Sequence, residues 1–170
     1  MNDALLANAV REHQAGNLAE AARLYNAVLQ GAPRNFQALY LLGFIQFQQG
    51  RFEDAERLIG EAVKINPHAP DAFYNRGCAL QYLQRHEEAL AAFDRALALK
   101  PDYGDALTNR GATLLALKNH RDAIASFEAA LALQPRDGEA LSNRATALFE
   151  IKRYEEASAA YERLIAATPP

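Results

Sequence analysis

The chain has 170 residues, half of them hydrophobic and 23% charged, with a net charge of −3 at pH 7. This composition excludes a disordered chain, and no apolar run approaches the roughly 20 residues that a membrane-spanning helix needs. The slightly acidic balance argues against a nucleic-acid partner, because binding to phosphates requires a concentrated surface of Lys and Arg.

Two features of the sequence favour a cytoplasmic protein. Residues 1–11 lack the basic start and the apolar core of a secretory signal. The chain has a single cysteine, Cys78, which cannot form a disulfide within the chain. We therefore expect a cytoplasmic localisation and no membrane partner.

One sequence pattern recurs every 34 residues. Residues 71–101 read DAFYNRGCALQYLQRHEEALAAFDRALALKP, and the same hydrophobic and small positions return in residues 105–135 and 139–169. A proline closes each period, at Pro33, Pro67, Pro101, Pro135 and Pro169. A fixed period of this length indicates that short repeats stack into one array. The predicted array covers residues 1–170, with repeats at 2–35, 36–69, 70–103, 104–137 and 138–170.

The pattern is weaker in the first two repeats and clear in the third. There, Phe73, Gly77 and Leu80 are spaced as on one face of a helix, and a second apolar series begins at Ala89. Pro101 has no N–H and disfavours helical geometry in the residue before it, so the second helix is predicted to end there. Each repeat is therefore predicted to be a helix-turn-helix, and the fold class is predicted to be all-α.

The fifth repeat ends without a following helix. In a stack of this kind, each second helix is covered by the first helix of the next repeat. Leu164 and Ile165 lie in the last predicted second helix and would remain uncovered. Either the chain is a piece of a longer protein, or this end packs on a partner or on a second copy of the chain.

The repeated residues resemble those of the tetratricopeptide repeat (TPR) family over essentially the whole chain. Position eight of each repeat is small, as Ala9, Gly43, Gly77, Gly111 and Ala145. Position twenty is alanine, as Ala21, Ala55, Ala89, Ala123 and Ala157. Position twenty-four is bulky, as Tyr25, Ile59, Phe93, Phe127 and Tyr161. Small residues allow two helices to approach closely, and the large one fills the space beside them. The resemblance implies a right-handed superhelix, or solenoid, whose first helices line a concave groove.

Three asparagines occupy position six of successive repeats: Asn75, Asn109 and Asn143. An amide side chain offers a donor and an acceptor, so a column of amides can hold the backbone of an extended peptide. The column resembles the asparagine ladder in the TPR region of O-linked N-acetylglucosamine transferases, which implies that it binds protein substrates by their backbone. The alternative is that each amide makes hydrogen bonds only within the array.

Other side chains are expected on the same face. The apolar candidates are Tyr40, Phe44, Phe47, Tyr74, Cys78 and Tyr82. Aromatic side chains supply much of the binding energy of protein interfaces, although a residue such as Phe47 could instead belong to the core. Asp71 and Asp105 at position two would favour basic ligands, but helix capping explains them equally well.

Arginines stand at position seven of the last three repeats, as Arg76, Arg110 and Arg144. We interpret them as structural residues that lay their aliphatic stems along the helices. Their guanidinium groups are expected to lie in water.

The sequence has no catalytic motif. There is no phosphate-binding glycine loop and no Cys, His or carboxylate cluster at metal-ligand spacing. We therefore predict a protein that is not an enzyme, has no cofactor or metal, and binds an extended peptide segment of a partner protein. Two alternatives remain, namely a substrate-recruiting segment of a larger bacterial glycosyltransferase and a self-assembling module that associates through Leu164 and Ile165.

Overall fold

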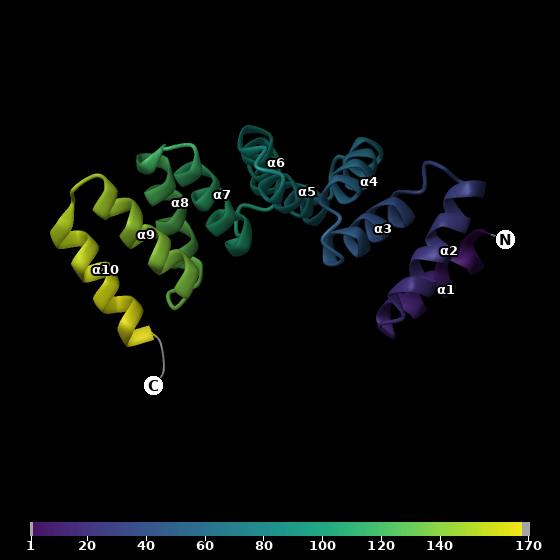
Figure 1. Cartoon of the computed structure of the whole chain (residues 1–170), viewed down its shortest axis with the longest axis horizontal. Helices are drawn as coiled ribbons and strands as arrows, with labels where there is room; N and C mark the ends of the chain where they lie inside the picture. The colour runs from purple at the N-terminus through teal and green to yellow at the C-terminus, as the bar shows by residue number, and fades with distance from the viewer. Residues whose placement is uncertain (1, 168–170) are drawn as a thin grey trace. The chain divides into compact units, whose positions relative to one another are not determined.

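The computed structural model describes residues 2–167, which form ten α-helices and no strand (Figure 1). The helices follow one another along the chain, two in each 34-residue period, so the predicted all-α fold of helix-turn-helix repeats is confirmed. The chain divides into two compact halves, Met1–Leu83 and Gln84–Pro170, called here the N-terminal and C-terminal halves. Within residues 2–167, every helix is too short or too polar to cross a lipid bilayer.

The N-terminal half contains five helices. They are α1 (Asn2–Gln14), α2 (Leu18–Gly31), α3 (Phe36–Gln48), α4 (Phe52–Ile65) and α5 (Pro70–Tyr82). Each helix packs on the next one along the chain, and α3 also contacts α5. The first helices of the second and third repeats therefore lie next to each other in this half.

The C-terminal half also contains five helices. They are α6 (His86–Leu99), α7 (Gly104–Ala116), α8 (His120–Leu133), α9 (Gly138–Glu150) and α10 (Tyr154–Ala167). Consecutive helices pack on each other here too, and α7 contacts α9 in the way that α3 contacts α5. Each half thus presents a pair of neighbouring first helices.

Prolines end the second helices as the sequence predicts. The helices α2, α4, α6 and α8 each stop two residues before a proline, at Gly31, Ile65, Leu99 and Leu133. The residue after each helix lies outside the helical region, with ψ between 76° and 94°, because helical geometry is disfavoured in the residue before a proline. The fifth proline of the series, Pro169, lies outside the described residues.

The turn inside each repeat contains one residue in the left-handed region, always at position fifteen. These residues are Gly16 (φ 80°), Gly50 (φ 74°), Gln84 (φ 58°), Lys118 (φ 60°) and Lys152 (φ 64°). Glycine adopts this conformation without steric cost, whereas a residue with a Cβ is strained by about 1 kcal/mol. The last three repeats therefore keep the turn against local preference, because the packing of the two helices requires it.

The core consists of the positions that define the period. All five position-twenty alanines are buried, and so are four of the five bulky residues at position twenty-four: Tyr25, Ile59, Phe93 and Phe127. A Cβ added to Gly111 would lie 2.5 Å from the Phe127 ring, and one added to Gly43 would lie 2.6 Å from Ile59. The predicted close approach of the two helices, with a large side chain beside a small one, is confirmed.

Tyr25 makes the stability of the N-terminal half sensitive to alkaline pH. Its side chain is fully buried, with the hydroxyl 3.4 Å from Nδ1 of His13, and burial raises its pKa to about 12. A raised folded-state pKa contributes stability that is complete below the unfolded-state value near 10 and is lost as the pH rises above it. We expect the denaturant concentration at the unfolding midpoint to decrease as the pH is raised from 10 to 12. The decrease should be smaller in Tyr25→Phe. An equal fall in both proteins would contradict this role for Tyr25.

Candidate functional site

In the N-terminal half, the helices α3 and α5 bring Tyr40 and Asn75 together. The Asn75 amide donates a hydrogen bond of 2.8 Å to the Tyr40 hydroxyl, and the Tyr40 ring stacks on Phe36 with centroids 5.9 Å apart. Burial raises the pKa of Tyr40 and the nearby Asp71 carboxylate raises it further, while the bond from Asn75 partly offsets both effects. Asn75 is therefore held in a fixed position by a side chain of the preceding repeat.

An aromatic cluster, defined by Phe47, Phe52 and Tyr82, lies at the end of the same two helices. Tyr82 stacks on Phe52 with centroids 4.2 Å apart and meets the edge of Phe47 at 5.6 Å. Phe47 is half-buried, whereas Tyr82 is 61% exposed. The cluster therefore places a rigid aromatic surface in solvent, and Phe47 forms its half-buried part.

The other predicted residues of this half lie around these two groups. Phe44 is half-buried, with its ring 6.3 Å from the His13 ring. Tyr74 and Cys78 on α5 are half-buried as well, and Cys78 forms no disulfide. Asp71 is exposed in the first turn of α5, but the capping position itself is Ala69, so Asp71 does not cap this helix.

The C-terminal half holds the other two asparagines on neighbouring first helices. Asn109 on α7 and Asn143 on α9 are both half-buried. The Asn109 amide donates a 3.0 Å hydrogen bond to the backbone carbonyl of Asp105, one turn earlier in its own helix. The exposed Asp105 side chain lies in the first turn of α7, where Tyr103 is the capping residue. The alternative of hydrogen bonding within the array thus applies at least in part to Asn109.

The three position-seven arginines bind carboxylates on the second helix of the preceding repeat. The pairs are Arg76 with Glu56 (2.8 Å), Arg110 with Asp94 (2.6 Å) and Arg144 with Glu128 (2.7 Å). Their interpretation as structural residues is confirmed, but the prediction that their guanidinium groups lie in water is wrong. The physical reason is that each carboxylate belongs to another repeat, so the spacing within one repeat does not reveal it.

The last helix presents one of the two predicted apolar residues to solvent. Ile165 is 73% exposed. Leu164 is half-buried and packs against a core cluster that includes Leu131 and Leu141. An association surface on α10 would therefore be formed by Ile165 rather than by both residues.

Sequence reasoning missed Phe36, Phe52 and His13. Phe52 begins a second helix, and only first-helix positions were considered for the binding face. The available signal was the adjacency of Phe52 to the turn that ends α3, because side chains on either side of a short turn lie close together. His13 lies near Phe44 of the following repeat, a contact that no local pattern indicates.

Comparison with known families settles the nature of the repeats. Models of the tetratricopeptide repeat match residues 12–74, 70–103 and 110–170. The chain is built from tetratricopeptide repeats. The finer resemblance of its TPR repeats to those of O-linked N-acetylglucosamine transferases stays a prediction.

Solved TPR structures share the fold over nearly the full length. The crystal structure of MamA is 24% identical, with a TM-score of 0.89 over 94% of this chain and 93% of that one. A MamA fragment from Desulfovibrio magneticus RS-1 is 16% identical, with a TM-score of 0.90 over 98% and 94%. YrrB, described as a TPR protein with an unusual peptide-binding site, is 21% identical, with a TM-score of 0.91 over 97% and 85%. The TM-scores establish a shared fold, and at these identities they show the fold alone. No curated protein sequence matches the chain.

Proposed function

We propose that this TPR chain is a non-catalytic interaction module that binds an extended segment of a partner protein along its first helices. The observation that carries the proposal is the aromatic cluster of Phe47, Phe52 and Tyr82, which keeps a large, preordered ring exposed at the end of α3 and α5, the two helices that carry Tyr40 and Asn75. Rigid aromatic side chains contribute binding energy at a small cost in conformational entropy. An exposed aromatic ring of this kind favours a protein partner.

Asn75 has the hydrogen-bonding capacity that backbone recognition needs. One of its two amide hydrogens is donated to Tyr40, which leaves the second hydrogen and the carbonyl oxygen for a ligand. These groups match the C=O and N–H of an extended peptide. Because Tyr40 already fixes the amide, binding costs less rotamer entropy than it would at a free asparagine.

Asn109 and Asn143 are the amides at the equivalent positions of the C-terminal half. They lie on α7 and α9, which contact each other as α3 and α5 do. The role proposed for them is the same backbone recognition, with Asp105 nearby favouring basic side chains of the ligand, as Asp71 does in the N-terminal half. Peptide binding by YrrB, a TPR protein of the same fold, supports this use of the scaffold.

The experiment that tests the proposal uses a displayed library of linear peptides, selected against the intact chain. We expect the triple substitution Asn75→Ala, Asn109→Ala and Asn143→Ala to weaken all selected peptides by about tenfold or more, whatever their side chains, since each lost backbone hydrogen bond contributes about 1 kcal/mol. Fluorescence anisotropy measures the affinities, and circular dichroism checks the fold.

The matched control is Gln30→Ala, which removes an amide side chain from the second helix α2. Affinities of this variant should equal those of the unchanged chain. A triple variant that binds as tightly as the control would disprove the asparagine column, and a selection that yields no binding peptide would disprove peptide recognition itself.

A second candidate function is self-assembly, favoured by the 73% exposure of Ile165 on α10. An exposed isoleucine at the end of a helical stack offers an apolar contact to another copy. Sedimentation over a range of concentrations separates this candidate from the first. Association that disappears in Ile165→Arg would support it, whereas a monomer throughout would exclude it.

A third proposal is that the chain recruits substrates for a bacterial glycosyltransferase. It rests on the register of the three asparagines alone, and would use the same surfaces of α5, α7 and α9. A coding sequence that continues beyond Pro170 into an α/β nucleotide-sugar domain would support it.

A further inference from the structure

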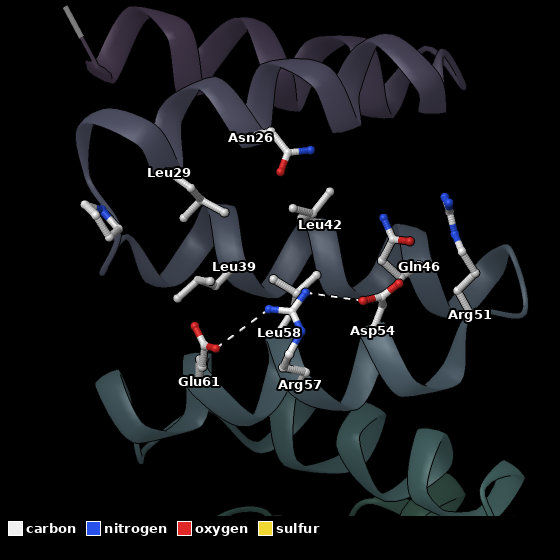
Figure 2. A pocket seen from close by; sticks show the side chains of 11 residues that line it. Asn26, Leu29, Leu39, Leu42, Gln46, Arg51, Asp54, Arg57, Leu58 and Glu61 are labelled. Atoms are coloured by element: carbon white, nitrogen blue, oxygen red, sulfur yellow. Dashed lines mark hydrogen bonds and ion pairs between the residues drawn. The ribbon is translucent and has the colours of Figure 1, made fainter.

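A groove in the N-terminal half lies between the second helices α2 and α4 and over α3, and none of the three asparagines lines it (Figure 2). Its volume is about 470 Å³. The floor is apolar and comes from Leu29, Leu39, Leu42 and Leu58. Polar side chains surround the floor, and they are Asn26, Gln46, Arg51, Asp54, Arg57 and Glu61.

The corresponding space at the other repeat junctions is occupied by an arginine of the chain. At the junction of α6, α7 and α8, Arg110 donates to Asp94 on one side and to Ser126 on the other, both at 2.6 Å. Two periods, or 68 residues, earlier in the chain, Arg110 corresponds to Leu42, Asp94 to Asn26 and Ser126 to Leu58. All three of these earlier residues line the groove. The groove is therefore open because a leucine replaces the arginine that would fill it.

The other two junctions follow the same rule. Arg144 reaches Glu128, which stands at the position of Asn26. At the junction of α4 and α5 this position is Gly60. Nε of Arg76 lies 3.4 Å from where a Cβ on Gly60 would be, and Arg76 pairs with Glu56 instead. An arginine with its stem on leucines and its guanidinium at an acceptor is thus the side chain that this space accommodates.

Gln46 gives independent evidence that the groove receives a ligand. Its position is leucine in the following repeats, as Leu80, Leu114 and Leu148. Gln46 is only 9% exposed and lines the groove, and Figure 2 draws no hydrogen bond from its side-chain amide to the other lining residues. Among the described residues, Nδ1 of His86 is the only buried side-chain polar atom without a partner, so the Gln46 amide still reaches solvent in the groove, where a ligand can bond to it.

The groove is lined by two carboxylates, Asp54 and Glu61, and by two guanidinium groups, Arg51 and Arg57, so its formal charge is balanced. The Arg57 guanidinium lies between two carboxylates, 3.3 Å from Asp54 and 3.8 Å from Glu61, as the dashed lines in Figure 2 show. Two carboxylates thus share one guanidinium on α4. Arg51, at the end of the groove, donates instead to the neutral Gln49.

We propose that the groove binds an arginine side chain presented by a segment of a partner protein, replacing in trans the arginine that the other junctions supply in cis. The aliphatic stem lies on Leu39, Leu42 and Leu58. The guanidinium donates to the Gln46 carbonyl oxygen and to the carboxylate of Asp54 or Glu61. This site is lined by residues of α2, α3 and α4 and by none of the three asparagines, so it does not depend on the asparagine column.

The probe is the blocked peptide Ac-Ala-Arg-Ala-NH₂, compared with the same peptide carrying citrulline, a neutral analogue of equal shape. NMR titration should show shifts of the Gln46 side-chain amide and of the methyl groups of Leu39, Leu42 and Leu58 with the arginine peptide, and at least about tenfold weaker binding of the citrulline peptide. Equal binding of both peptides would overturn the proposal, and so would the absence of shifts at Gln46.

Two variants convert the groove into the form seen elsewhere in the chain. Leu42→Arg with Asn26→Glu fills it as Arg144 and Glu128 fill theirs, and should abolish the shifts. Gln46→Leu keeps the opening but removes the amide, and should weaken the arginine peptide by about tenfold. Unchanged binding in either variant would contradict the site. Methyl shifts that depend on protein concentration without any peptide would mean that a second copy occupies the groove, and would also overturn the proposal.

Discussion

Replacing Phe127 with alanine is expected to lower the free energy of unfolding by about 3–5 kcal/mol, the largest stability effect of the changes considered. The Phe127 ring is fully buried and packs directly against the backbone at Gly111. Truncation leaves a cavity between α7 and α8, since backbone cannot move into the space as a flexible side chain could. A loss of this size is a large part of the roughly 5–15 kcal/mol by which domains are stable.

Chemical denaturation followed by circular dichroism measures this loss. The matched control is Phe149→Ala, because Phe149 is 58% exposed and contacts only the edge of Tyr154 among the aromatic rings of the described residues. Its effect should stay within about 1 kcal/mol. Similar losses in the two variants would show that the pairing of large and small residues does not form the core.

Replacing Tyr82 with alanine is expected to weaken the binding of selected peptides by about tenfold or more, the largest effect on binding of any single change. Tyr82 supplies the exposed ring of the aromatic cluster, and truncating a central aromatic residue of an interface costs about 2 kcal/mol or more. The fold should persist, because stacking with Phe52 and Phe47 contributes only about 0.5–1.5 kcal/mol per aromatic pair.

The control for Tyr82 is Tyr161→Ala. Tyr161 is also exposed, at 40%, but it lies in the middle of the second helix α10. Calorimetry with the same peptides should show full affinity for this variant. If both substitutions weaken binding equally, the aromatic cluster is not part of the binding surface.

Much of the fold could be predicted from the sequence because the same pattern of prolines, small residues and large residues recurs in five repeats. The proline after each second helix has no backbone N–H to donate and disfavours helical geometry in the residue before it. The ends of these helices can therefore be predicted from Pro33, Pro67, Pro101 and Pro135. The pairing of small residues with large ones fixes which faces meet. These signals are local or recur at one spacing.

The turn at position fifteen could not be predicted, although it recurs with the same period. Gln84, Lys118 and Lys152 are good helix formers, and nothing in their neighbourhood marks a left-handed residue. Their conformation is imposed by the contact between the two helices they join. Tertiary packing here overrides intrinsic preference.

The site was predicted less completely, because its contacts join different repeats. The hydrogen bond from Asn75 to Tyr40 links positions six and five of neighbouring first helices, and the bond from Asn109 to Asp105 stays within one helix. Position five of the preceding repeat is tyrosine for both asparagines, Tyr40 for Asn75 and Tyr74 for Asn109, so the sequence alone does not distinguish the two cases. The period identifies equivalent positions but not their neighbours.

The central claim, that a partner segment lies along the first helices, is tested most directly by photo-crosslinking. A selected peptide carrying a diazirine group is bound, irradiated and mapped by mass spectrometry. The account predicts crosslinks to α3, α5, α7 and α9, with the strongest near Tyr82 and Asn75. Crosslinks confined to the second helices α4, α6 and α8 would contradict it.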